Sequence, residues 1–180
     1  FAIRDDGSLY SWGTSEYGEL GGGSLDTCLI PTKILDDVVE IGWFAARQTL
    51  GCIFAITSDR TMYTWGGYSS EGGNMWGENG NGTDNGTLVP VPILEHVKEV
   101  GTETPHVLTE NGDLYAWGGA DLYLSLGLGD TGAHLSPTRL DLENVVQFAG
   151  SEALTADGSL YIWGFTNEDG TEALSPVKIL

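Results

Sequence analysis

Few side chains in this 180-residue sequence have the type and spacing that acid–base or metal chemistry requires. The three histidines are His96, His106 and His134, and none has a carboxylate or a cysteine at the spacing of a metal site or a catalytic triad. Cys28 and Cys52 form no C-x-x-C pair, so they are expected to be buried thiols. We therefore expect no metal, no cofactor and no enzymatic activity.

Carboxylates are abundant, but their positions favour surface charge over catalysis. The pairs Asp5-Asp6, Asp36-Asp37 and Glu168-Asp169 could serve as general acid and base, yet they fall at predicted strand ends, where solvated turn carboxylates are common. The stretch 78–86 lacks the regular carboxylate spacing and the terminal Glu of a calcium loop. A glycan-binding or hydrolytic surface would need carboxylates that converge in one pocket, and it remains a third-ranked alternative.

The overall charge limits the classes of partner. With 26 acidic and 7 basic residues, the formal net charge is −19 at pH 7. Nucleic-acid affinity comes largely from Lys and Arg that neutralise phosphates, so DNA, RNA and anionic membranes are not expected partners. The charge is compatible with a protein partner that has a basic surface. The scarcity of Lys and Arg favours an extracellular or cell-surface location over a cytoplasmic one.

Aromatic residues in predicted loops are candidates for protein binding, because Tyr and Trp are favoured anchors at interfaces. Tyr68 and Tyr123 are expected to be exposed. Tyr17 and Trp76 precede a glycine at equivalent repeat positions, so exposure and packing against a sheet edge are equally weighted for them. Phe165 is a further aromatic residue in a predicted loop. The predicted binding positions are Tyr17, Tyr68, Trp76, Asp121 and Tyr123.

These loops must be positioned by a repeat, because the pair Trp-Gly recurs at intervals of about 50 residues. The four copies are Trp12-Gly13, Trp65-Gly66, Trp117-Gly118 and Trp163-Gly164. Three of them close a segment in which Asp-Gly or Asn-Gly precedes alternating apolar residues, whereas Arg60 replaces the turn glycine in the second copy. Such turns between apolar stretches predict β-hairpins with type I′ geometry.

A Pro-led strand and a Val-rich strand follow most hairpins, which makes about four strands per repeat. Four short antiparallel strands at this period are typical of a β-propeller blade, which needs neighbouring blades to cover both of its faces. We predict an all-β fold in which residues 1–180 form one region of about three and a half blades, a partial propeller or half-ring. The four repeat Trp residues should join the blades, each contributing on the order of 5 kcal/mol at most.

With these segments, the sequence resembles the regulator-of-chromosome-condensation repeat family. The run 153–164 and the loop 74–83 carry the resemblance most clearly, although the join at 42–52 is longer, and those at 101–106 and 150–152 are shorter, than the family pattern. The resemblance implies a propeller, typically of seven blades, so two copies of this chain could form a homodimer that completes a ring. It also implies that His106 lies at or beside a structural histidine position.

We interpret the chain as a non-catalytic protein-interaction module or scaffold that presents acidic and aromatic loops. A structural or adhesive repeat segment of an exported surface protein is one alternative. A guanine-nucleotide exchange factor-like regulator of a small GTPase is another, because some members of the family have that role, although no exchange-factor signature is recognised here.

Overall fold

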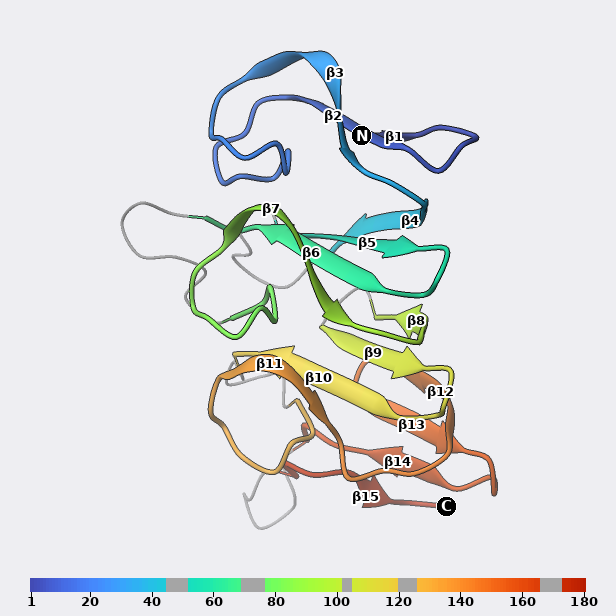
Figure 1. Cartoon of the computed structure of the whole chain (residues 1–180). Helices are drawn as coiled ribbons and strands as arrows, with labels where there is room; N and C mark the ends of the chain where they lie inside the picture. Colours follow the sequence, from blue (N-terminus) through green and yellow to red (C-terminus); the bar gives the residue numbers. More distant parts are fainter. Residues whose placement is uncertain (45–51, 69–76, 102–104, 120–125, 166–172) are drawn as a thin grey trace.

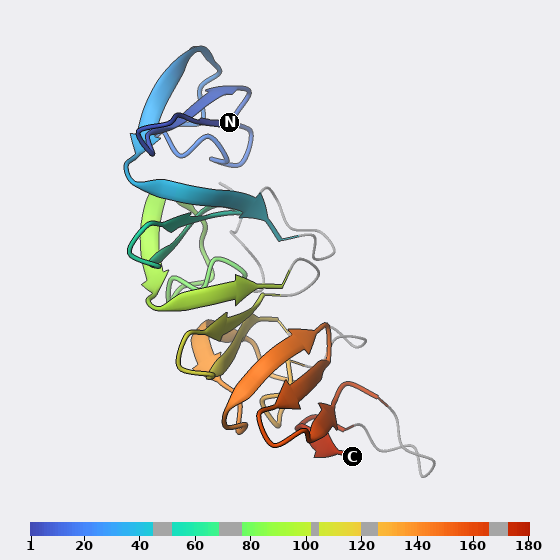
Figure 2. The ribbon, with the colours of Figure 1, turned by 90° about the vertical axis from the view of Figure 1, so that its right-hand side faces the viewer.

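The computed structural model describes residues 1–44, 52–68, 77–101, 105–119, 126–165 and 173–180. Within these ranges, short strands form four separate antiparallel sheets that are stacked in sequence order, with the two termini at opposite ends of the stack (Figure 1). Turned by 90°, the four sheets still form a single column (Figure 2). No helix in the described ranges is long and apolar enough to cross a membrane.

Each sheet is an up-and-down meander of consecutive strands, as expected for propeller blades. The first sheet has three strands and the other three have four. The strands are β1 Ala2–Ile3, β2 Leu9–Gly13 and β3 Cys28–Leu35; β4 Val38–Trp43, β5 Ile53–Thr57, β6 Met62–Gly66 and β7 Thr87–Leu94; β8 Val97–Val100, β9 His106–Thr109, β10 Leu114–Gly118 and β11 His134–Arg139; β12 Val145–Ala149, β13 Glu152–Thr155, β14 Leu160–Ile162 and β15 Val177–Lys178. The predicted all-β partial propeller is confirmed.

The connections between strands fall on two opposite rims of the stack, on the right and left of Figure 1. We call one the hairpin rim, which comprises the turns 4–8, 58–61, 110–113 and 156–159 and the crossovers 36–37, 95–96 and 140–144. We call the other the loop rim, which comprises the described residues 14–27, 67–68, 77–86, 126–133, 164–165 and 173–175. Short turns define the first rim and long glycine-rich loops define the second.

The hairpins are present, but their predicted type I′ geometry is wrong. Only one residue in each turn has a positive φ, and in the second turn this residue is Arg60, at 66°. There the Arg60 N–H donates to the carbonyl of Thr57 and the Thr57 N–H to that of Thr61, which is a type I turn followed by a left-handed residue. The Asp59 carboxylate accepts the Thr61 N–H. This hydrogen bond stabilises the turn.

Tryptophan side chains join successive sheets. Trp65, Trp117 and Trp163 are buried between their own sheet and the preceding one. The Trp117 Nε1–H donates to the carbonyl of Glu78 at 2.8 Å, and its indole covers Gly80, where a Cβ atom would lie 2.8 Å from Nε1. Gly80 also has a positive φ of 64°. Glycine is therefore required here for two reasons, the left-handed backbone and the lack of space for a Cβ atom.

The same backbone hydrogen bonds recur at all three junctions between sheets. On the loop rim, a glycine N–H of one sheet donates to a leucine carbonyl of the next: Gly23 to Leu88, Gly82 to Leu135 and Gly129 to Leu174. On the hairpin rim, the first residue of the next sheet donates back to the turn: Val38 to Gly7, Val97 to Arg60 and Val145 to Gly112. The repeated sequence segments therefore form equivalent hydrogen bonds at each junction.

The first repeat Trp differs from this pattern. Trp12 is 42% exposed, because no described sheet packs against that face of the first sheet. Trp65, Trp117 and Trp163 thus lie at junctions between described sheets, whereas no described sheet covers Trp12. Leu29 and Ile30 of β3 are exposed on the first sheet as well.

Replacing Arg60 with Gly is expected to raise the free energy of unfolding by about 1 kcal/mol, since a left-handed backbone costs an L side chain roughly 1–2 kcal/mol. The exposed Arg60–Glu110 pair, at 4.0 Å, contributes too little to offset this gain. Urea unfolding midpoints would measure the change, with Gly112→Arg at the equivalent turn as the reverse control. An unchanged or lower midpoint for Arg60→Gly would contradict the prediction.

Replacing Trp117 with Phe is expected to lower the free energy of unfolding by about 2 kcal/mol or more, because the Glu78 carbonyl loses its donor and a cavity remains. The same replacement at the half-exposed Trp12 should cost less than about 0.5 kcal/mol. Thermal and urea unfolding would compare the loss of stability at Trp117, which is buried between two sheets, with the loss at Trp12, which is not. Equal losses would mean that the junction is not the source of the stability.

Candidate protein-interaction surface

The loop rim brings two of the predicted binding residues together. The Tyr68 N–H donates to the carbonyl of Tyr17 at 2.9 Å, so the loops of the first and second sheets are in contact there. Both tyrosines are half-buried, and Tyr68 is therefore less exposed than expected. Phe165 is also half-buried, on the loop rim of the fourth sheet. Trp76, Asp121 and Tyr123 lie outside the described residues, as do the paired acids Glu168-Asp169.

Local hydrogen bonds hold the Tyr17 loop in place. The Glu19 carboxylate accepts the Tyr17 N–H at 2.7 Å and the Glu16 N–H at 3.3 Å. Hydrogen bonds to an ionised acceptor are among the stronger ones in proteins. The position of Tyr17 is thus set by its own loop before any partner binds.

The second loop is anchored by a buried polar pair. The Asn79 side chain is fully buried; its Nδ2 donates to the carbonyl of Gly66, and its Oδ1 accepts the Cys52 Sγ–H. Burial raises the pKa of the Cys52 thiol, with a smaller contribution from the charge of Glu78. Cys52 is therefore a structural thiol, as predicted, whereas Cys28 is half-buried and donates to the carbonyl of Ile30.

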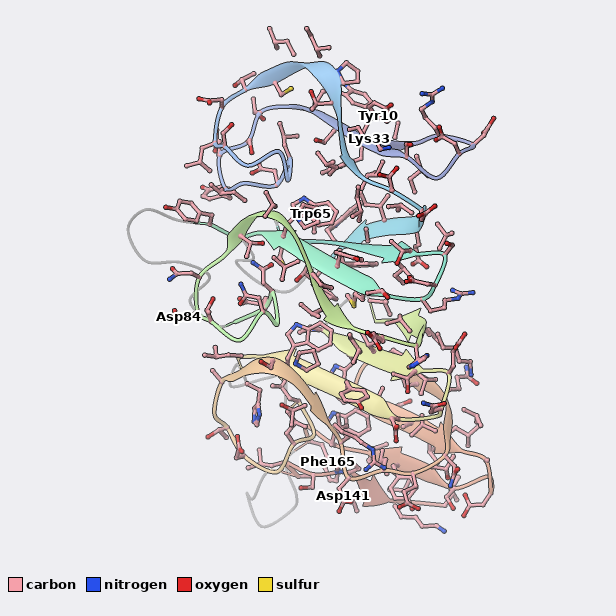
Figure 3. The ribbon with its side chains drawn as sticks, in the orientation of Figure 1. Tyr10, Lys33, Trp65, Asp84, Asp141 and Phe165 are labelled. Carbon is pink, nitrogen blue, oxygen red and sulfur yellow. The ribbon has the colours of Figure 1, made fainter. Side chains whose placement is uncertain are left out.

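Both rims are acidic, but they differ in whether they also carry Lys or Arg. No Lys or Arg occurs on the part of the loop rim that the structure describes, while four acidic side chains are exposed there: Glu16, Asp26, Asp84 and Asp130. The described Lys and Arg residues lie on strands or at the hairpin rim: Arg4, Lys33, Arg60, Lys98, Arg139 and Lys178. Figure 3 shows Asp84 on the loop rim, away from Lys33 on the first sheet.

Several of these cations are already paired with carboxylates near the hairpin rim. Lys33 contacts Asp36, and the Arg139 Nε lies 2.7 Å from the Asp113 Oδ1. The hairpin rim therefore carries charges of both signs, although acidic side chains outnumber Arg there as well. The described loop rim has only acidic formal charge, with His134 as its one basic neighbour among the described residues, 3.1 Å from Asp130.

Trp43 is a candidate binding residue that sequence reasoning missed. It ends β4 at the loop-rim side and is 69% exposed, which is unusual for a Trp side chain. The next residue, Phe44, is buried against Phe54 and Trp117. Successive residues of an extended chain point to opposite faces, so the buried Phe44 places Trp43 outside. The adjacent aromatic pair was the available signal in the sequence.

The histidines do not converge with carboxylates in a pocket. His96 lies in a crossover with a φ of 59°, His106 is fully buried, and His134 pairs with Asp130 on the loop rim. Among the residues that the structure describes, no three His, Cys, Asp or Glu residues are grouped closely enough to hold a metal ion.

Two repeat-equivalent grooves occur on the hairpin rim. One of about 380 Å³ is lined by Asp36, Asp37, Asp59 and Tyr63, and the other, of about 610 Å³, by Asp157 and its neighbours. The Thr57 hydroxyl and the Thr61 N–H lower the pKa of Asp59. The equivalent Thr155 and Ser159 groups lower that of Asp157 to about 2. A general acid needs the opposite shift, so these carboxylates are turn-stabilising groups.

The sequence was compared with protein families and with curated proteins. Residues 6–42 match the regulator of chromosome condensation (RCC1) repeat. The ultraviolet-B receptor UVR8 of Arabidopsis thaliana is 33% identical to this chain. The alignment is 201 residues long and covers 99% of this chain and 43% of the receptor. The human E3 ubiquitin-protein ligase HERC2 is 30% identical over 188 residues, which cover 91% of this chain and 4% of the ligase. The chain thus spans less than half the length of these relatives.

Solved structures show the same architecture. Prp20p from Saccharomyces cerevisiae superimposes with a TM-score of 0.69 at 20% identity, covering 99% of this chain and 47% of Prp20p. Human WBSCR16 gives a TM-score of 0.59 at 22% identity, covering 99% of this chain and 50% of that protein. At these identities, the superpositions establish the fold alone.

Proposed function

Because this chain belongs to the regulator of chromosome condensation (RCC1) repeat family, we propose that it is a non-catalytic protein-interaction module whose loop rim binds a Lys- and Arg-rich surface of a partner protein. The observation that carries the proposal is that the described part of the loop rim has exposed carboxylates and no Lys or Arg. Exposed carboxylates without neighbouring Lys or Arg on the described loop rim leave a negative field that a basic protein surface would complement.

Relatives support protein binding in general terms. One solved structure of Prp20p concerns its binding to Gsp1p and histones, and another shows yeast RCC1 (Prp20) bound to Kap60. These are properties of a protein about twice as long as this chain, at 20% identity or less. They support a protein-binding role for the propeller, but the partner proposed here rests on the charge of this chain.

Trp43 would supply the apolar part of the interface. Interfaces draw most of their binding free energy from a few aromatic and Arg residues, whereas rim charges mainly accelerate association. An exposed indole can accept a Lys or Arg side chain over its face, in a cation–π contact worth roughly 0.5–1 kcal/mol at an exposed site. We propose Trp43 as the anchor and the loop carboxylates as the groups that orient the partner.

The proposal that the chain is not an enzyme is supported by the state of its acidic groups. The Gly132 N–H and the His134 side chain lower the pKa of Asp130, the loop-rim carboxylate with the nearest histidine. A carboxylate held ionised in this way serves charge recognition better than proton donation. An exchange factor-like role remains an alternative, as does a purely structural segment of a surface protein, for which the loop rim would bind nothing.

Binding of labelled Lys/Arg-rich peptides, with acidic and neutral peptides of equal length, would test the proposal at two salt concentrations. We expect basic peptides to bind preferentially and to dissociate as salt rises, because exposed charges are screened. The variant Glu16→Gln/Asp26→Asn/Asp84→Asn should weaken binding about tenfold, as should Trp43→Ala. The matched control, Asp5→Asn/Glu95→Gln/Glu143→Gln, changes the net charge equally on the hairpin rim. Equal effects of the two triple variants would overturn the assignment of the loop rim.

A ring completed by a second copy would use the exposed face of the first sheet. Trp12 and Leu29 there occupy the positions at which Trp65 and Leu88 are covered in the first junction. Light scattering coupled to size exclusion would support this homodimer if the mass were twice 19.2 kDa and fell to that value in Trp12→Asp. A mass of 19.2 kDa at every concentration would contradict it.

A further inference from the structure

One backbone carbonyl in the glycine-rich loop of each of the first three sheets accepts a hydrogen bond from a side chain of its own sheet. In the first two sheets the donor is a hydroxyl: Ser11 Oγ to the carbonyl of Leu20, and Thr64 Oγ1 to that of Asn79, both at 2.6 Å. In the third sheet the equivalent carbonyl, that of Leu126, contacts His106 Nε2 at 3.2 Å. This carbonyl immediately precedes the glycine on which the next Trp lies.

The histidine replaces a hydroxyl that the third sheet lacks. Ala116 stands where Ser11 and Thr64 stand in the first two sheets, and it has no donor. His106 is directly opposite Ala116 in the β9–β10 register, as Phe54 is opposite Thr64 in the β5–β6 register. The donor has therefore moved to the neighbouring strand, where a longer side chain reaches the same carbonyl.

The exchange makes this anchor titratable. A carbonyl only accepts, so the neutral imidazole must carry its proton on Nε2. The described groups around the ring are uncharged: Ala116 on β10, the Leu126 carbonyl of the loop, and the indole of Trp163, whose centroid is 5.8 Å from that of the imidazole. Burial lowers the pKa of His106 to about 4, against a smaller opposing effect of the Leu126 carbonyl.

The junction that contains His106 also has fewer hydrogen bonds than the other two. Trp65 and Trp117 donate their Nε1–H to the carbonyls of Glu19 and Glu78. Among the described residues, the buried Nε1 of Trp163 has no hydrogen-bond partner. Within the described residues, the third junction therefore has its loop anchor but no indole hydrogen bond.

We propose that His106 makes the junction between the third and fourth sheets acid-sensitive, so that a fall in pH loosens loop 126–133 while the first two junctions stay closed. The Ser11 and Thr64 hydroxyls that anchor the other loops do not titrate in this range. Loop 126–133 is part of the loop rim, so acid would also change the proposed binding surface. That consequence rests on the proposed function, but the sensitivity itself does not.

The direction and size follow from proton linkage. The neutral imidazole of His106 is favoured in the closed junction and the charged imidazole in the open one. The contribution of His106 to the stability of the closed junction is therefore fully present above pH 6.5 and is lost as the pH falls toward 4. Between pH 7.5 and pH 5, the equilibrium constant for opening should rise by about 30-fold. Below pH 4 the histidine contributes no further loss.

Hydrogen exchange of three equivalent amides tests the proposal within one molecule. Gly23, Gly82 and Gly129 each donate their N–H across a junction, from the first to the third. After correction for intrinsic exchange, opening at Gly129 should increase by tens of fold between pH 7.5 and pH 5, without an equivalent increase at Gly23 or Gly82. The variant His106→Phe/Ala116→Thr, which transfers the Phe54–Thr64 arrangement of the second sheet, should abolish the difference.

His134→Gln is the matched control, because it removes the other histidine of the third sheet, which pairs with Asp130 of loop 126–133. The proposal is overturned if this control loses the response, if the double variant keeps it, or if all three amides respond equally in the wild type. Should the double variant fail to fold, NMR titration of the wild-type imidazole decides: the His106 ring must titrate well below pH 6.5. The chain is measured alone, so failure of the proposed function would leave the result unaffected.

Discussion

The indole of one sheet lying on a glycine of the preceding loop is the contact on which the rest of the molecule depends. The sheets have separate strand sets, so no strand ladder links one sheet to the next. What links them is a buried side chain and a few backbone hydrogen bonds. A left-handed glycine gives the indole a flat surface, and in the first two junctions the carbonyl two residues before that glycine accepts the indole N–H. Each repeat must therefore carry one Trp at the end of a hairpin strand and one glycine in the following loop.

Because of this arrangement, the two rims differ in how far their connections can change in length and charge. On the hairpin rim, the turns are short and their carbonyls accept hydrogen bonds from the next sheet, so a change of length there would break a junction. On the loop rim, only the anchor carbonyl, the glycine and the leucine contact are fixed. The chain between them varies in length and charge from repeat to repeat without disturbing the core. Binding residues on such a scaffold are expected in loops of this kind, held by rigid elements.

The repeat, the hairpins and the propeller could be predicted because they depend on local patterns and on their recurrence. The turn type could not, because Asp59 stabilises a type I turn through its side chain and leaves only Arg60 left-handed. The exposure of Trp12 depends on whether a sheet covers it, which is a tertiary fact. The exposure of Trp43 could not be predicted because the join at 42–52 departs from the repeat pattern. The contact of His106 with the loop carbonyl could not be predicted because the sequence indicates only a structural histidine position. For Trp12 and His106, the neighbours that decide the role are distant in sequence.

The acidic character of the loop rim and the titration of His106 can be separated by pH. Ordinary carboxylates titrate near pH 4, and hydrogen bonds hold the pKa of Asp130 below its usual value. Acidification from pH 7.5 to pH 5 therefore leaves most of the negative charge in place, while the open form of the third junction gains population through His106. A basic partner that dissociates in this range would be responding to the geometry of loop 126–133, because the field that attracts it has hardly changed. Opening would also release the fourth sheet from that loop, since the Gly129–Leu174 hydrogen bond that joins them is broken in the open form.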